Sequence, residues 1–258
     1  MIAIEKISID NIPVLHVVKQ DSIKQLLPTV FFLHGFTSTK ETNLNYAYLM
    51  AEKGLRVVLP EALYHGERGG DKTDKELGFS FWEIVLNNIK ELESLKNYFT
   101  DKGLTDSAKI GVAGTSMGAI TTLGALKCYE WISSAVSLMG SPAFRKLAEW
   151  QIAETEKLGI SLPFTEEQTA RLLARISEYD ISLHPEKLSG RPLLFWHGKL
   201  DSVVPYEGAE DFFEEVKEDY KSFPEKLQFI SDSHAGHKVS KTAIRQTAEW
   251  FELHLNRQ

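Results

Sequence analysis

The chain has 258 residues, and its 29 Lys and Arg against 36 Asp and Glu give a formal net charge of −7. Hydrophobic residues make up 43% and charged residues 25%, as in ordinary globular proteins, and the acidic balance excludes the basic footprint that binds nucleic acid or anionic lipid. The single cysteine, Cys128, excludes an intramolecular disulfide and a multi-cysteine metal site and favours a cytoplasmic location.

The chain opens on two β-type runs. Residues Ile2–Ile9 and Ile12–Val18 flank Asp10-Asn11, and this pattern predicts an antiparallel hairpin. Charged residues interrupt the first run, where a secretory signal would need an apolar core, and this again favours the cytoplasm.

Short apolar runs continue along the chain, and helical patterns separate most of them. The runs span Thr29–Phe36, Leu55–Glu61, Lys109–Gly114, Ser133–Gly140, Arg191–Gly198 and Lys226–Ser231. The helical patterns span Thr42–Lys53, Phe81–Phe99, Met117–Tyr129, Tyr206–Tyr220 and Val239–Leu255. Strands that are apolar on both sides and alternate with helices predict a mostly parallel sheet covered by helices on both faces.

Residues 141–190 break this alternation. They hold two helical patterns, Ala143–Leu158 and Thr165–Tyr179, and no convincing strand. A single crossover helix needs far fewer residues. We therefore expect one α/β domain over residues 1–258, with a small helical lid inserted at 141–190. The alternative is an enlarged crossover packed on the sheet face.

The strongest motif is Gly114-Thr115-Ser116-Met117-Gly118, between a predicted strand and a predicted helix. This is the setting of a G-x-S-x-G nucleophile elbow, a sharp turn that projects the serine hydroxyl above the sheet. The flanking glycines let strand and helix approach closely, and the helix N-terminus offers N–H groups to a developing oxyanion. We expect Ser116 to be a nucleophile; the alternative is a glycine-rich turn, with or without a bound phosphate.

A serine nucleophile needs a base, and two of the eight histidines follow the last predicted strand. His237 is the favoured base because Gly236 before it permits a tight loop, and His234 is its competitor. The carboxylate that would orient the imidazole is Asp201, which follows the run Arg191–Gly198; Asp180 and Asp232 are rivals.

The oxyanion would be stabilised by two backbone N–H groups. One belongs to Met117, directly after the nucleophile, and the other comes from the loop after the run Thr29–Phe36. We assign this second N–H to Phe36, with Thr37 as the alternative. His34, which precedes them, is expected to order the loop.

Together these residues resemble the α/β-hydrolase superfamily, in which the triad follows the chain order Ser116, Asp201, His237. The matching segments are His34-Gly35-Phe36, Gly114–Gly118, His197-Gly198 with Asp201, and Gly236-His237. The His-Gly-Phe loop and the segment HGKLDSVVP resemble the prolyl-oligopeptidase-like and dienelactone-hydrolase-like branch of bacterial carboxylesterases. Dienelactone hydrolases use a cysteine nucleophile, so a serine at this position argues against that activity.

The resemblance implies an α/β-hydrolase fold and a serine carboxylesterase that acts through an acyl-enzyme on Ser116. Because the insertion is short beside the caps of lipases, we expect short acyl chains, acetyl to butyryl. The expected partner is a small-molecule ester, with no cofactor, metal, nucleic acid or membrane. A peptidase, amidase or acyltransferase with the same triad is an alternative, and a non-catalytic binding module is an alternative of another class.

Overall fold

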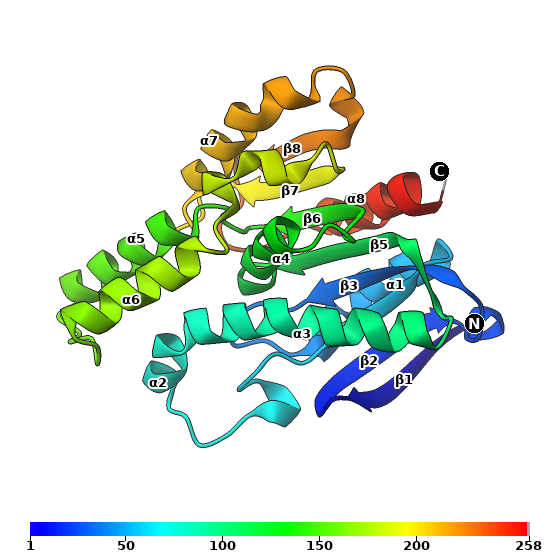
Figure 1. The fold of residues 1–258 in the computed structure, drawn as a ribbon, viewed down its shortest axis with the longest axis horizontal. Helices are drawn as coiled ribbons and strands as arrows, with labels where there is room; N and C mark the ends of the chain where they lie inside the picture. The colour runs from blue at the N-terminus through cyan, green and yellow to red at the C-terminus, as the bar shows by residue number, and fades with distance from the viewer. Residues whose placement is uncertain (257–258) are drawn as a thin grey trace.

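One eight-stranded sheet forms the centre of the computed structural model, which describes residues 1–256 (Figure 1). Its strands are β1 (Ile2–Ile9), β2 (Ile12–Lys19), β3 (Leu27–Leu33), β4 (Arg56–Pro60), β5 (Thr105–Thr115), β6 (Ser134–Leu138), β7 (Leu193–Gly198) and β8 (Leu227–Asp232). The spatial order is β1-β2-β4-β3-β5-β6-β7-β8. Strands β1 and β2 pair antiparallel, β2 pairs antiparallel with β4, and all later pairs are parallel.

The predicted hairpin is confirmed, and its turn has a local cause. Asp10 and Asn11 have φ angles of 48° and 64° between the paired residues Ile9 and Ile12. A two-residue turn with positive φ at both positions matches the twist of the flanking strands, and Asp and Asn tolerate that conformation.

Helices cover both faces of the sheet and make two separate cores. The helices are α1 (Leu44–Glu52), α2 (Asp74–Phe79), α3 (Phe81–Asp101), α4 (Met117–Cys128), α5 (Phe144–Lys157), α6 (Glu166–Ser177), α7 (Tyr206–Val216) and α8 (Lys241–Phe251). One core joins the sheet to α3, α4 and α7 through residues such as Ile89, Ile120 and Phe212. The other joins it to α1 and α8 through residues such as Met50 and Phe251. The predicted fold class is confirmed.

Helix α2 is the main element that the sequence analysis missed. Its first turn is closed by a capping box, in which the Thr73 side chain accepts the Glu76 N–H and the Glu76 carboxylate accepts the Thr73 N–H. A threonine followed three residues later by glutamate is a recognised helix start. That signal was present in the sequence, but the helix is only 6 residues long and buries no residue, so it lacks an apolar stripe.

The two helices of the insertion, α5 and α6, form a hairpin that projects beyond the body of the molecule (Figure 1). Its base is packed, because Phe144, Leu147 and Ile176 are buried in the larger core. Its tip is not, because Leu158 is 76% exposed and Phe164 is 38% exposed. The hairpin is thus packed mainly at its base, and toward its tip it meets the body through the ring contact of Phe164 with Phe79, whose centroids are 5.9 Å apart.

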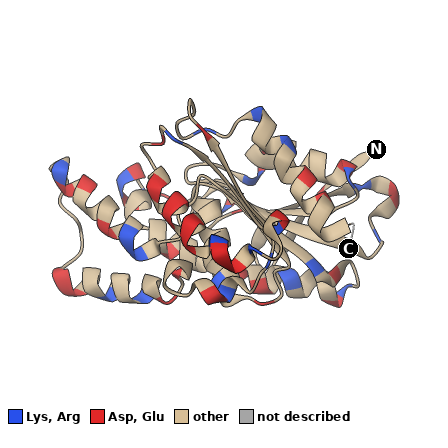
Figure 2. Cartoon of the chain, turned by 90° about the horizontal axis from the view of Figure 1, so that it is seen from above, with Lys and Arg blue, Asp and Glu red and all other residues tan. Residues whose placement is uncertain are grey.

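Figure 2 shows basic and acidic residues spread over the exposed helices, with both charges on the helices of the insertion. On α5 and α6 they pair within one helical turn, as in Arg145–Glu149 and Glu167–Arg171. Such exposed pairs are worth about 0.3–0.5 kcal/mol each, so packing of the apolar faces dominates the stability of these helices. Among residues 1–256, none of the helices is both long and apolar enough to cross a bilayer.

Candidate active site

Ser116 lies at the turn between β5 and α4, with φ 51° and ψ −115°. A non-glycine residue reaches this region only when its surroundings hold it there. Glycines on either side create those surroundings. A Cβ atom on Gly114 would lie 2.3 Å from the backbone of Gly118, and one on Gly118 would lie 2.1 Å from the Leu33 oxygen. Strand, helix and the start of the next loop therefore close tightly around the turn.

The structure brings Ser116, His237 and Asp201 together in one line of hydrogen bonds. The Ser116 hydroxyl lies 2.8 Å from Nε2 of His237, which stands in the loop between β8 and α8. Nδ1 of the same imidazole donates to Oδ2 of Asp201 at 2.7 Å. Because Asp201 is a carboxylate, Nδ1 carries the ring proton and Nε2 is left as the acceptor for the serine proton.

Asp201 is held by donors on both of its oxygens. Its Oδ1 accepts the N–H groups of Val203 and Val204 at 2.9 and 3.0 Å, and its Oδ2 lies 3.3 Å from Nε2 of His197 in addition to His237. Burial alone would raise the pKa of this carboxyl, but the hydrogen bonds from the two histidines and the two backbone groups hold the pKa well below its usual range. Asp201 therefore stays charged and faces the imidazole in one orientation.

The rivals of these residues lie elsewhere. His234 is exposed, and its Nδ1 pairs with the hydroxyl of the neighbouring Ser233 at 3.0 Å. Asp232 accepts the backbone N–H of His234 at 3.0 Å and so belongs to the turn. Asp180 accepts the N–H of Arg145 at the start of α5 at 2.9 Å, which makes it a support of the insertion.

The backbone around the serine offers two N–H groups of the kind that stabilise an oxyanion. Met117 is the first residue of α4, where a helical N–H has no partner within its own helix. Phe36 lines the same cavity as Ser116, and no acceptor among residues 1–256 takes its N–H. The alternative donor, Thr37, already gives its N–H to Nε2 of His65 at 3.0 Å. This favours Phe36.

A cavity of about 420 Å³ opens at Ser116 between the body and the insertion. Most of its wall is apolar and comes from the loop after β3, the region of α2 and the start of α3, the insertion, and the segment before α7. The wall residues include Phe36, Phe79, Phe81, Trp82, Trp150, Leu162, Phe164, Leu172, Val203 and Val204.

A hydrogen bond that was not predicted from the sequence joins two residues of the cavity wall. The indole N–H of Trp82 at the start of α3 donates to Oε1 of Gln151 on α5 at 2.9 Å. Trp82 itself is packed against Phe144, with ring centroids 5.2 Å apart. No local pattern could have indicated a pairing between residues 69 positions apart.

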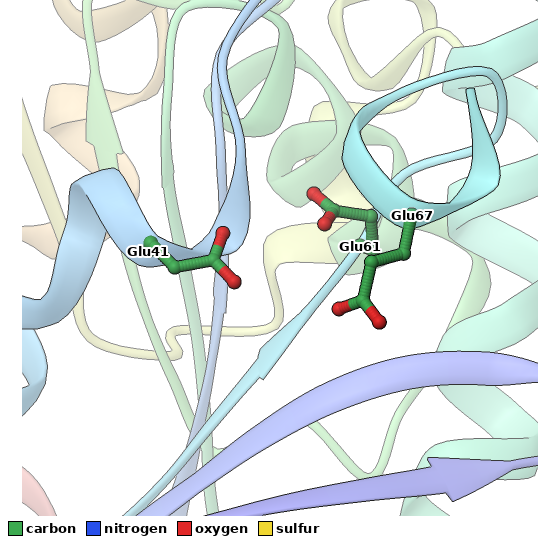
Figure 3. Close-up of side chains that lie close together, drawn as sticks. All are labelled: Glu41, Glu61 and Glu67. Atoms are coloured by element: carbon green, nitrogen blue, oxygen red, sulfur yellow. The ribbon is translucent and has the colours of Figure 1, made fainter.

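Three carboxylates lie close together near the loop after β4, in an arrangement that could bind a metal ion. Oxygen atoms of Glu41, Glu61 and Glu67 lie within 4.8 Å of one another (Figure 3). The ammonium of Lys40 already occupies their centre, at 2.9, 2.6 and 2.6 Å from the three. Burial would raise the pKa of Glu61, but the contact with the His34 imidazole and the hydrogen bonds from Lys40 outweigh it and lower that pKa to about 2. The lysine thus supplies the cation that these carboxylates need.

Known proteins resemble this chain over most of its length. The sequence model of the prolyl oligopeptidase family matches residues 43–258. "Putative esterase YitV" of Bacillus subtilis (strain 168) is 52% identical over 255 residues, which cover 99% of this chain and all of that protein. Esterase YjfP of Escherichia coli (strain K12) is 31% identical over 262 residues, with 99% and 100% covered.

Among solved structures, TT1662 from Thermus thermophilus superposes with a TM-score of 0.74 at 20% identity, over the full length of both chains. This likeness supports the fold and nothing finer. Together, the comparisons confirm the branch of the superfamily and the enzyme class expected from the sequence, a hydrolase of the carboxylesterase type.

Proposed function

Because the chain belongs to the prolyl oligopeptidase family, we propose that it hydrolyses carboxylic esters through an acyl-enzyme on Ser116. The observation that carries this proposal is the line of hydrogen bonds from Ser116 to His237 and from His237 to Asp201, at 2.8 and 2.7 Å. The two relatives named as esterases add support, because each matches nearly the whole chain.

In the proposed mechanism, Oγ of Ser116 attacks the ester carbonyl while Nε2 of His237 takes the hydroxyl proton. The carbonyl oxygen becomes an oxyanion that accepts the N–H groups of Phe36 and Met117. His237, now charged, is stabilised by Asp201 and gives its proton to the departing alcohol as the C–O bond breaks. A water molecule then attacks the acyl-enzyme by the same route and releases the acid and free Ser116.

We propose small esters with short acyl chains, acetyl to butyryl, as substrates. Small-molecule sites span about 300–1,000 Å³, so a cavity of about 420 Å³ is at the lower end of the range and has to hold both acyl and alcohol parts. A series of p-nitrophenyl esters from acetate to palmitate tests this. We expect kcat/KM to be highest at four carbons or fewer, and a maximum at eight or more would contradict the proposal.

The catalytic roles are tested by Ser116→Ala. We expect kcat to fall by about 10⁴-fold or more, with the melting temperature little changed, because the nucleophile is lost while alanine keeps the Cβ atom and the same backbone conformation. Ser233→Ala is a matched control, since that hydroxyl contacts His234 on the exposed loop and should leave kcat unchanged. A fluorophosphonate probe should label the wild type at Ser116 and should not label Ser116→Ala. Ester hydrolysis that survives Ser116→Ala would refute the assignment.

Amide hydrolysis uses the same acyl-enzyme route, so a matched amide and ester pair decides between an esterase and a peptidase. Because esters are intrinsically more reactive than amides, a peptidase would also cleave the ester faster, so the amide is the informative substrate. We expect no measurable hydrolysis of the amide, and sustained amide turnover that Ser116→Ala abolishes would favour a peptidase. The cytoplasmic location stays a prediction, to be checked by fractionation of cells that express the protein.

A further inference from the structure

The loop that carries Phe36 needs support from outside itself. It leaves β3 at Leu33 and turns sharply at Thr37, whose φ is 59°. A β-branched residue rarely takes a positive φ, so something must compensate for this backbone conformation. The Thr37 N–H belongs to the Phe36–Thr37 peptide, so a contact that holds it restrains the backbone of Phe36 from its C-terminal side, next to the Phe36 N–H that would be the oxyanion donor.

The compensating contact comes from His65, in the loop after β4. Its Nε2 accepts the Thr37 N–H at 3.0 Å, and its Nδ1 lies 2.8 Å from the Leu63 carbonyl oxygen. A backbone N–H can only donate and a carbonyl oxygen can only accept, so His65 is neutral with its proton on Nδ1. His65 is 4% exposed, and burial lowers its pKa, which favours this neutral form.

A second histidine, His34, makes the reciprocal contact, from the loop after β3 to the loop after β4. Nε2 of His34, on the loop after β3, accepts the N–H of Ala62, on the loop after β4, at 3.0 Å. The two imidazole rings pack edge to face with centroids 5.2 Å apart, and the His65 ring also lies 5.5 Å from that of Phe36. Each loop thus receives one imidazole from the other, so the two loops hold one another in place.

A buried ion pair lies next to this pair of histidines. Glu61 accepts both the backbone N–H and the ammonium of Lys40, at 3.1 and 2.6 Å, and its Oε1 lies 3.2 Å from Nε2 of His34. The far end of the oxyanion loop is therefore tied to the same partner loop. The start of the loop is held by the contact of His34 with Ala62, and its end by the contact of Lys40 with Glu61. The Phe36–Thr37 segment lies between these two points, and His65 contacts that segment.

We propose that His65 is a positioning residue for the oxyanion hole. By accepting the Thr37 N–H, it removes the competing donor and sets the backbone so that the Phe36 N–H faces the oxygen of the substrate. This inference rests on the proposed function. It differs from a purely structural role, because it requires an acceptor atom at the Nε2 position and not only a ring that fills space.

Three substitutions distinguish a positioning role of His65 from a purely structural one. His65→Gln keeps an acceptor oxygen at about the reach of Nε2, His65→Asn has the same amide on a shorter chain, and His65→Phe keeps an aromatic ring without an acceptor. Steady-state kinetics on p-nitrophenyl acetate would be measured for each, with melting temperatures recorded in parallel. The Gln and Asn pair still answers the question if His65→Phe fails to fold.

Loss of one oxyanion donor lowers kcat by about 10²–10³-fold, and loss of its positioning should have a smaller effect. We expect His65→Asn and His65→Phe to lower kcat by about 10–100-fold with KM changed less than about threefold. His65→Gln should stay within about fivefold of the wild-type kcat. This order must hold among variants with similar melting temperatures.

Equal kcat values for the Gln and Asn variants, or a loss that appears only in KM, would overturn the inference. If the wild type hydrolyses the ester but all three variants match it, the inference fails and the proposed function stands. If the wild type neither hydrolyses any ester nor reacts with a fluorophosphonate at Ser116, the proposed function fails, and the inference fails with it.

Discussion

The floor and the roof of the cavity at Ser116 are built in opposite ways. The floor consists of strand ends and short loops, and its polar groups are buried and multiply bonded: Asp201 has donors on both oxygens and Glu61 is 1% exposed. The roof is the hairpin of α5 and α6, whose tip exposes Leu158 and Phe164. A rigid floor suits chemistry that depends on positions held to fractions of an ångström, whereas a lightly anchored roof can adapt to different substrates.

The largest effect should come from the floor, at Asp201→Asn. The amide can present its nitrogen to His237 and stabilise the wrong tautomer, so we expect kcat to fall by about 10⁴-fold. Asp180→Asn is the control, because that carboxylate caps α5 and should affect stability while leaving kcat within about threefold. Similar kcat losses in both variants would remove the distinction between floor and roof.

Glu61→Gln tests the buried part of the floor. It removes the buried carboxylate beside the Lys40 ammonium, which keeps the more exposed Glu41 and Glu67 as partners, and we expect the free energy of unfolding to fall by about 1–3 kcal/mol. Glu41→Gln is a milder control, since that side chain is 51% exposed. Denaturant unfolding monitored by tryptophan fluorescence measures both variants.

The stabilisation of the folded state by the Glu61–Lys40 ion pair is predicted to depend on pH. The pKa of folded Glu61 is about 2, below the ordinary 4.5, so as the pH falls the unfolded chain takes up the proton first. The stabilisation is therefore complete above about pH 4.5 and is lost between pH 4.5 and 2. The difference in unfolding free energy between wild type and Glu61→Gln should shrink across that window. A difference that stays constant down to pH 3 would contradict the assignment.

Trp82→Phe tests the contact between floor and roof. The ring is kept but the hydrogen bond to Gln151 is lost, which should destabilise the roof by about 1 kcal/mol. We expect KM for short esters to rise a few fold, kcat to change little, and amide exchange in α5 to become faster. Trp131→Phe is a matched control, because that indole bonds to Glu93 away from the cavity. Equal effects of the two changes on KM would refute a role of Trp82 at the site.

The smallest effect should come from the tip of the roof. Leu158→Ser replaces a side chain that is 76% exposed, and we expect the free energy of unfolding to change by no more than about 0.5 kcal/mol. A loss above 1 kcal/mol in thermal or denaturant unfolding would mean that the tip is covered in solution.

Local sequence patterns accounted for most of the framework. Alternating apolar runs and helical patterns predicted the parallel sheet with helices on both faces, and Asp10-Asn11 predicted the hairpin. Boundaries were less accurate: the strand expected at Thr29–Phe36 is Leu27–Leu33, because His34 and the residues after it belong to the loop. The lid expected at 141–190 stays a prediction, although α5 and α6 lie within it.

The sequence by itself determined the strand–turn–helix around Ser116 and the chain order of serine, aspartate and histidine, because these depend on short-range geometry. Only the tertiary structure decided between His237 and His234 and brought His65 to Thr37, since these contacts join residues 121 and 28 positions apart. Side-chain partners of this kind leave no periodic trace in the sequence. They arise when parallel strands bring the loops at their carboxyl ends together at one edge of the sheet.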